Sequence, residues 1–250
     1  MAEKHYVDKD VQSMLLPLNL MQTIALYPKY SIWNNVITPN SAISNVLSLC
    51  ATMAATIVHI YEVFELCYDA DVVFKYIVSS IQYFASFFDI FLTCIGFNFY
   101  YFICIFHSKN NVSFVLKFQK VHRFLTDSKR KRFIFWNWIT MASLIIFDVA
   151  VLIYIHVKLH FPLYNLFCCL MSISFDVSMN YALRLMKLLS DKIEVWNMEA
   201  QNLRLLHHSN SDMHCQNMFK AYVQILECYN LFKCSFQQIV CITDVFFCIF

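Results

Sequence analysis

The length of the apolar runs is the feature that most constrains how this chain can fold. Residues 41–61 contain no Asp, Glu, Lys or Arg, and each of the runs 76–106, 133–157 and 159–183 contains a single charged residue, an aspartate. About 20 helical residues cross the ~30 Å hydrocarbon core of a bilayer, so each run is long enough to span a membrane. The sequence therefore predicts an all-α, polytopic transmembrane helical bundle.

We predict membrane-spanning helices at about 41–61, 80–104, 135–157 and 161–183, and a fifth, incomplete one at 234–250. Composition agrees with this prediction, because 59% of the residues are hydrophobic and only 14% are charged. A typical soluble domain has roughly 25% charged residues. A chain of this composition has too few polar side chains to cover the surface of a soluble domain of its size.

Lysine and arginine indicate the orientation of the bundle, because loops rich in them stay in the cytoplasm. The segment 1–40 and the connections 107–132 and 184–233 together hold 17 of these residues, whereas the two other connections hold 2. We therefore predict a cytoplasmic N-terminus at 1–40, a transmembrane receptor domain at 41–250, and cytoplasmic connections at 107–132 and 184–233. Helical periodicity in the second connection predicts that two helices extend into the cytoplasm and meet in a loop at 207–217.

The chain ends inside an apolar run. Residues 239–250 number 12, and a helix of that length rises only ~18 Å, less than the ~30 Å of the hydrocarbon core. A helix ending there would leave its carboxylate and last carbonyl groups in the apolar layer. We therefore expect the chain to be the N-terminal fragment of a longer protein, truncated in the fifth helix.

Several classes of chemistry are disfavoured by what the sequence lacks. The chain has one glycine, Gly96, and glycine-rich loops that hold phosphates need several. None of the 11 cysteines forms a CxxC pair, and the histidines fit no standard zinc spacing. We expect no enzymatic activity, no cofactor, no metal and no nucleic-acid partner.

Four aspartates lie within the predicted spans, and ionisable groups there usually face protein or water rather than lipid. Asp89 and Asp148 lie near mid-membrane, while Asp176 and Asp244 lie nearer the cytoplasmic side. Each is a candidate for a ligand pocket or an ion-accessible cavity. The alternative is a protonated or hydrogen-bonded packing residue.

Several stretches of the chain resemble the insect gustatory receptor family, particularly moth receptors. They are "LLPLNLMQTIALYPKYSIWNNVITPNS" before the first span, the charge-free first helix, the second span ending "NFYYFICIF", and the helix-rich second cytoplasmic connection. The resemblance covers most of the 250 residues, although the family's most specific signature belongs to a seventh helix that this chain does not reach. It implies a seven-helix receptor with inverted topology, in agreement with the orientation derived from the charges.

The resemblance also implies a function. Members of this family are multi-pass plasma-membrane receptors that assemble as tetramers and act as ligand-gated, non-selective cation channels that respond to tastants. We accordingly expect a small-molecule tastant as ligand, the lipid bilayer as surroundings, and a homo- or hetero-tetramer with other gustatory receptor subunits.

The family has no motif that identifies pocket residues in these spans, so the candidates come from depth and side-chain chemistry. Aromatic and acidic groups suit an amphipathic, often basic, compound. The candidate ligand-binding residues are Tyr83, Phe88, Asp89, Asp148, Tyr154 and Phe167.

Two other functional classes remain as alternatives. A G-protein-coupled-type chemoreceptor or an odorant receptor would also be a multi-span protein, although a coupled receptor would have its N-terminus outside, against the charge distribution. A membrane transporter would usually carry helix-breaking Gly or Pro in corresponding spans of two halves. The predicted spans contain only Gly96 and Pro162 of these residue types.

Overall fold

The computed structural model describes residues 5–73, 77–125, 130–159, 163–205 and 211–249, and within these ranges the side chains of 65–73, 77–86, 163–172 and 237–249 are among those not described. The described part is almost entirely helical, as the sequence predicts. Its helices are α1 (Lys9–Ile24), α2 (Ala42–Val73), α3 (Ile77–Phe106), α4 (Ser108–Phe124), α5 (Arg130–Leu159), α6 (Leu163–Leu205) and α7 (Ser211–Ile249).

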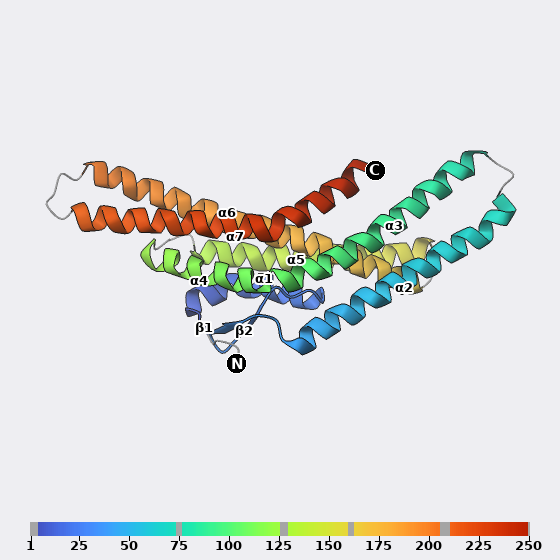
Figure 1. The fold of residues 1–250 in the computed structure, drawn as a ribbon, viewed down its shortest axis with the longest axis horizontal. Helices are drawn as coiled ribbons and strands as arrows, with labels where there is room; N and C mark the ends of the chain where they lie inside the picture. The colour runs from blue at the N-terminus through green and yellow to red at the C-terminus, as the bar shows by residue number, and fades with distance from the viewer. Residues whose placement is uncertain (1–4, 74–76, 126–129, 160–162, 206–210, 250) are drawn as a thin grey trace.

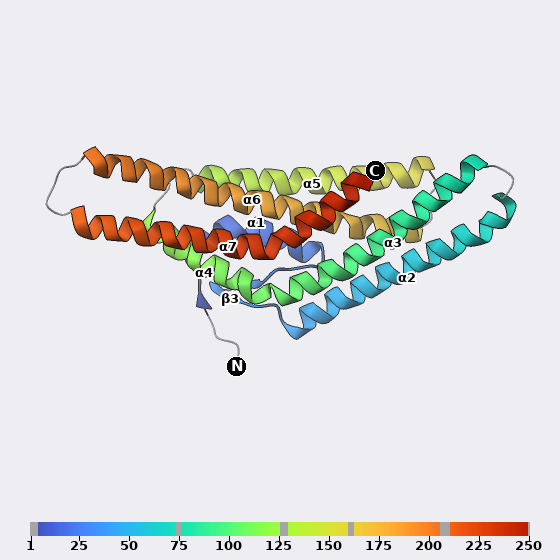
Figure 2. The same cartoon turned by 45° about the horizontal axis from the view of Figure 1, so that its top comes forward.

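The long helices run roughly along the long axis of an elongated molecule (Figure 1). The antiparallel pair α2 and α3 projects toward one end, and the antiparallel pair α6 and α7 projects toward the opposite end, in both Figure 1 and Figure 2. α5 lies along α6 between these two projections.

Two helical segments, Ala42–Glu62 and Arg130–Lys158, are long and apolar enough to cross a membrane. A third candidate is the bent pair Ile90–Phe106 and Ser108–Phe124, whose axes differ by 53°. The predicted spans 41–61 and 135–157 coincide with the first two segments, and 80–104 overlaps the bent pair. The predicted spans 161–183 and 234–250 include residues outside the described part, so the seven-helix bundle stays a prediction.

The connection predicted at 107–132 is largely a helix, α4, and not an irregular loop. Its apolar residues Phe114, Val115 and Phe118 are buried against α7, where Cys228 and Phe232 belong to the same cluster. The chain bends at His107, between α3 and α4, and so brings α4 alongside the part of α7 that is predicted to be cytoplasmic. Burial of this apolar face explains why a basic connection is ordered here.

The two predicted cytoplasmic helix extensions are present as the second half of α6 and the first half of α7 (Figure 1). α6 has 43 residues, about 65 Å of helix and roughly twice the thickness of the hydrocarbon core. α7 begins at Ser211, inside the loop predicted at 207–217. The loop prediction was too long because Met218 and Ala221 already pack against Val195 of α6, so the helix pair stays in contact close to its end.

A small antiparallel sheet was not predicted from the sequence, so the all-α description is incomplete. β3 (Val36–Thr38) lies between β1 (His5–Tyr6) and β2 (Ser31–Trp33), with Ile32 opposite Ile37. A two-residue turn joins β2 to β3, and both of its residues have positive φ, Asn34 at 49° and Asn35 at 62°. Asparagine tolerates this conformation better than most residues, and such turns match the twist of a hairpin.

The N-terminal segment fills the centre of the molecule. α1 packs against α5 and α6, and the amide of Asn137 on α5 donates to the carbonyl of Met14 at 3.1 Å. Tyr27 and Tyr30 follow α1 and are fully buried. The Tyr27 hydroxyl hydrogen-bonds Thr52 on α2 at 2.9 Å, and the Tyr181 hydroxyl on α6 donates to that of Tyr30 at 3.1 Å. The N-terminal segment therefore connects α1 to α2, α5 and α6.

Candidate functional site

An open groove of about 590 Å³ lies between α5 and α6, within the part predicted to be in the membrane. We call it the acidic groove because two aspartates, Asp148 and Asp176, contribute to its wall. Its lining residues are Thr140, Ser143, Leu144, Phe147, Asp148, Asp176, Met179, Asn180 and Leu183.

The helical repeat places the residues that line the acidic groove on the facing sides of α5 and α6. On α5, Thr140, Leu144 and Phe147 are spaced by four and three residues and so share one face of the helix. On α6, Asp176, Met179 and Leu183 are spaced by three and four residues and share the facing side. The antiparallel packing of the two helices brings Asp148 and Asp176 to one groove from positions 28 residues apart in the sequence.

The hydrogen bonds around Asp148 leave part of its carboxyl group without a partner. Its Oδ2 atom is shielded from solvent and has no hydrogen-bond partner among the described residues. The two hydroxyls that α5 contributes to this wall donate to the backbone of the same helix: Thr140 donates to the Trp136 carbonyl at 2.7 Å, and Ser143 donates to the Thr140 carbonyl at 3.0 Å. A buried acceptor without a partner costs roughly 1–3 kcal/mol, so a donor placed at Asp148 is favourable.

A cation suits this groove better than an anion or a neutral group. Two carboxylates that share one site repel each other, and a positive charge between them removes that repulsion. Phe147 adds an aromatic ring to the wall, and its exposed face could stack on an alkylammonium group. The arrangement can therefore bind an amine with an apolar body.

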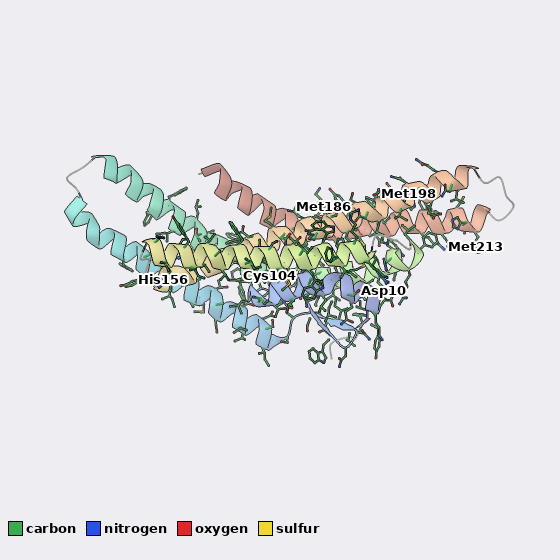
Figure 3. All side chains as sticks on the ribbon, turned by 180° about the vertical axis from the view of Figure 1, so that it is seen from behind. Asp10, Cys104, His156, Met186, Met198 and Met213 are labelled. Atoms are coloured by element: carbon green, nitrogen blue, oxygen red, sulfur yellow. The ribbon has the colours of Figure 1, made fainter. Side chains whose placement is uncertain are left out.

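The acidic groove opens through an apolar surface. The exposed side chains around it on α5 include Ile145, Ile146, Val149 and Ile153, and α5 crosses the front of the molecule when it is seen from behind (Figure 3). Contiguous exposed apolar surface of this kind marks contact with lipid or with another protein. A ligand would reach the groove through this apolar surface.

Of the six predicted ligand-binding residues, the structure places one, Asp148, in this groove. Tyr154 also lies on α5 but is 62% exposed, and Phe88 lies on α3; neither is among the described residues that line the acidic groove. Tyr83 and Asp89 on α3 and Phe167 on α6 have side chains outside the described residues, and their predicted roles stay predictions.

Sequence reasoning did not include Asp176 among the ligand-binding residues, because it was placed nearer the cytoplasmic side than Asp148. A signal was available in the sequence. The spans 135–157 and 161–183 are joined by a short connection and must pack antiparallel. Residues at equal distances from that connection, one on each helix, therefore lie side by side. Asp148 and Asp176 lie 12 and 14 residues from residues 160–162, and so are brought to the same depth.

A buried polar cluster lies behind α6 and was also missed. The amide of Gln22 on α1 donates to the Ser178 hydroxyl on α6 at 3.3 Å, and the Tyr100 hydroxyl on α3 bonds the same serine. Close by, the ammonium of Lys29, which is only 2% exposed, lies 3.3 Å from the Cys104 sulfur and 4.7 Å from the centre of the Tyr100 ring. The cluster ties the N-terminal segment to α3 and α6, directly behind the wall that carries Asp176.

The chain matches no protein-family model, no curated protein and no solved structure. Only the chemistry and geometry of its own residues therefore indicate a function.

Proposed function

We propose that this protein is a multi-pass plasma-membrane chemoreceptor of the gustatory type, in which an amphipathic, basic small molecule binds in the acidic groove and opens a cation channel. The observation that carries the proposal is the pair Asp148 and Asp176 in a groove between two predicted membrane helices. Carboxylates in such a place are costly and usually serve a ligand, an ion or a proton. No catalytic constellation is proposed.

The contacts among the basic segments support the proposed topology. The Arg123 guanidinium on α4 forms two hydrogen bonds, of 2.7 and 2.8 Å, to the carboxylate of Asp8 in the N-terminal segment. Lys117 on α4 lies 2.6 Å from Glu227 on α7. The three segments predicted to be cytoplasmic thus contact one another, as segments in one compartment can. The excess of Lys and Arg in those segments also supports the proposed orientation, with the N-terminus inside.

Exposed apolar surface supports assembly with further subunits. α5 presents exposed apolar residues along the predicted span, and the cytoplasmic part of α7 exposes Phe219, Tyr222 and Leu226 beyond any membrane. Large exposed apolar patches on a water-facing segment favour a protein partner. We propose a homo- or hetero-tetramer of such subunits as the channel.

The test is functional expression in cells that report calcium entry. Cells expressing the complete gene product are exposed to a tastant panel that contains amines paired with uncharged analogues of similar shape. Asp148→Asn is expected to reduce the response to the amines about tenfold or more, since a hydrogen bond to a charged group contributes roughly 1.5–3 kcal/mol, and to leave responses to the uncharged analogues within about twofold.

The matched control is Glu199→Gln, which removes one exposed carboxylate on the cytoplasmic part of α6. It should change neither class of response, and surface labelling should show equal delivery of both variants. Absence of any tastant-evoked entry, or an equal loss for charged and uncharged compounds, would contradict the proposed function.

A further inference from the structure

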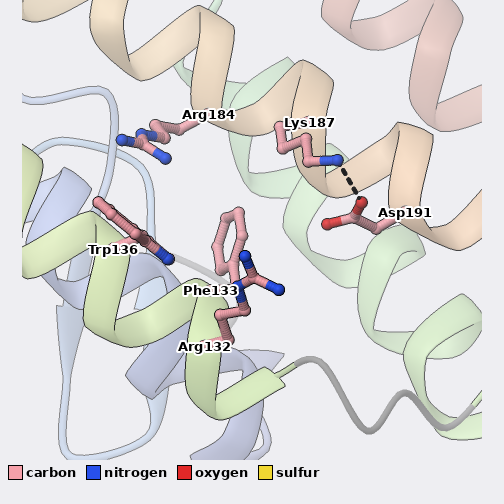
Figure 4. A pocket seen from close by; sticks show the side chains of 6 residues that line it. All are labelled: Arg132, Phe133, Trp136, Arg184, Lys187 and Asp191. Carbon is pink, nitrogen blue, oxygen red and sulfur yellow. Dashed lines mark ion pairs between the residues drawn. The ribbon is translucent and has the colours of Figure 1, made fainter.

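A second groove, of about 310 Å³, lies between α5 and α6 at the end where both helices leave the predicted spans (Figure 4). We call it the basic pocket. α5 contributes Arg132, Phe133 and Trp136, and α6 contributes Arg184, Lys187 and Asp191. Figure 4 shows the α6 cations facing the α5 side chains across the space between the two helices.

The basic pocket has an excess of positive charge. It contains three cations and one carboxylate, and that carboxylate, Asp191, is already paired with Lys187 at 2.8 Å. In the described part of the chain neither Arg132 nor Arg184 has an ion pair. Arg184 donates one hydrogen bond, to the Thr140 hydroxyl. A guanidinium has five N–H donors, so both arginines retain donors for an anion.

The position of the pocket along the helices matches the headgroup layer of a bilayer. Arg132 precedes the predicted span 135–157 by three residues, and Arg184 directly follows the predicted span 161–183. Trp136 lines the pocket and is partly exposed, and tryptophan rings favour the membrane–water interface. The two arginines therefore lie at the depth of lipid phosphates, with apolar helix surface beside them for acyl chains.

We propose that the basic pocket binds the headgroup of an anionic phospholipid that carries a phosphomonoester. The two arginines would hold the phosphate through paired N–H donors, a geometry that guanidinium groups favour. Basic pockets between membrane helices on the cytoplasmic side recognise phosphorylated lipid headgroups in this way. The pocket has a net charge of +2, because two arginines lie beside the Lys187–Asp191 ion pair. This charge complements a dianionic phosphomonoester better than a zwitterionic headgroup.

The experiment uses the full chain in nanodiscs of phosphatidylcholine with a few per cent of a phosphorylated phosphatidylinositol. After gentle extraction, native mass spectrometry counts retained lipid. The wild-type chain should retain one phosphorylated lipid, and Arg132→Gln should lower the retained fraction about tenfold, as expected for the loss of a charge-assisted hydrogen bond. Adding Arg184→Gln should abolish retention.

Lys131→Gln is the matched control, because it removes the same charge from the neighbouring exposed position that does not line the pocket. Retention should stay within about twofold of the wild type. Equal loss in Lys131→Gln and Arg132→Gln would overturn the proposal, since it would show attraction by general charge. Equal retention of phosphatidylcholine would overturn it as well.

Competition on the wild-type chain keeps the test independent of variant folding. A soluble inositol phosphate should displace the lipid, whereas inorganic phosphate at the same concentration should not. Equal displacement by inorganic phosphate would indicate a general anion site and overturn the assignment to a lipid headgroup. This outcome is separate from the calcium response to amines, so the two proposals can fail independently.

Discussion

Arg184 on α6 donates a hydrogen bond to the hydroxyl of Thr140 on α5, and this contact lies between two grooves of opposite charge. Arg184 lines the basic pocket, and Thr140 lines the acidic groove. Along α5, Arg132, Thr140 and Asp148 follow at intervals of eight residues, about 12 Å of helix each. The α5–α6 interface thus carries the proposed anion site near Arg132 and the proposed cation site at Asp148, about 24 Å from Arg132 along the helix.

Removal of the Thr140 hydroxyl should destabilise this interface. Thr140→Val keeps the shape of the side chain but leaves the guanidinium of Arg184 without its acceptor, and a hydrogen bond to a charged group contributes roughly 1.5–3 kcal/mol. We expect a lower midpoint of thermal unfolding in detergent. Thr140→Ser, which retains a hydroxyl, should unfold close to the wild-type temperature, and equal midpoints for the two variants would show that the contact is not stabilising.

The two aspartates of the acidic groove should act on the same ligand charge. Asp176→Asn should reduce the affinity for amines about tenfold, and the double variant with Asp148→Asn should lose less than the product of the two single effects. Contacts to one shared group are not additive. Radioligand or fluorescence binding of an active amine measures this directly. Strict additivity, or an unchanged affinity in Asp176→Asn, would show that the two aspartates do not bind the same ligand charge.

Asp8 and Arg123 should make stability fall at acid pH. Hydrogen bonds from the Arg123 guanidinium lower the pKa of Asp8, so the stabilising contribution is present above the ordinary aspartate pKa of about 3.9 and is lost as pH falls through the lower value in the folded state. Both side chains are substantially exposed, which limits the contribution to at most about 1 kcal/mol.

Asp8→Asn should therefore lower the unfolding midpoint at pH 6 and have little effect near pH 2, measured by thermal melts at both values. Arg123→Gln is the control, because it removes the same ion pair from the other side. A cost for Asp8→Asn that is equal at the two pH values would assign the effect to packing or backbone contacts instead.

Two cysteines of α7 should differ sharply in reactivity. Burial raises the pKa of the Cys228 thiol to about 12, so only about one molecule in 10⁴ carries the thiolate at pH 8. Cys215 on the same helix is exposed. Maleimide should modify Cys215 within minutes and leave Cys228 unmodified until the protein is denatured, as peptide mass spectrometry can show. Equal rates in the folded protein would contradict the packing of α4 on α7.

Glycosylation mapping should decide the orientation. Asp69→Asn with Asp71→Thr creates an acceptor site in the connection predicted to be outside, and this site should be modified. The natural site at Asn111 is a poor cytoplasmic control because Asn111 is buried in α4. Glu199→Thr completes a site that begins at the exposed Asn197 on α6, and this site should stay unmodified. A glycosidase-sensitive shift in gel mobility for the α6 site alone would show that the topology is the reverse of the one proposed.

The hydropathy pattern predicted the helices best where apolar residues dominate a long stretch. The charge-free run 41–61 coincides with the candidate membrane span of α2, and 135–157 lies within that of α5, because apolar length is a local property that no tertiary contact reverses. The connection 107–132 was predicted less well. Its lysines and histidines hid the apolar face that α4 packs against α7, and a hydropathy average does not detect such a face.

The sequence by itself determined that this protein is helical, which segments are apolar enough to cross a membrane, and where its charges are concentrated, because each of these follows from composition and short-range order. Only the tertiary structure decided which charges meet. The antiparallel packing of α5 and α6 placed Asp176 beside Asp148 and Arg184 beside Thr140, and the bend at His107 brought Arg123 to Asp8. These pairs join residues far apart in the chain, and their proximity depends on how the helices are rotated and bent, which local periodicity does not specify.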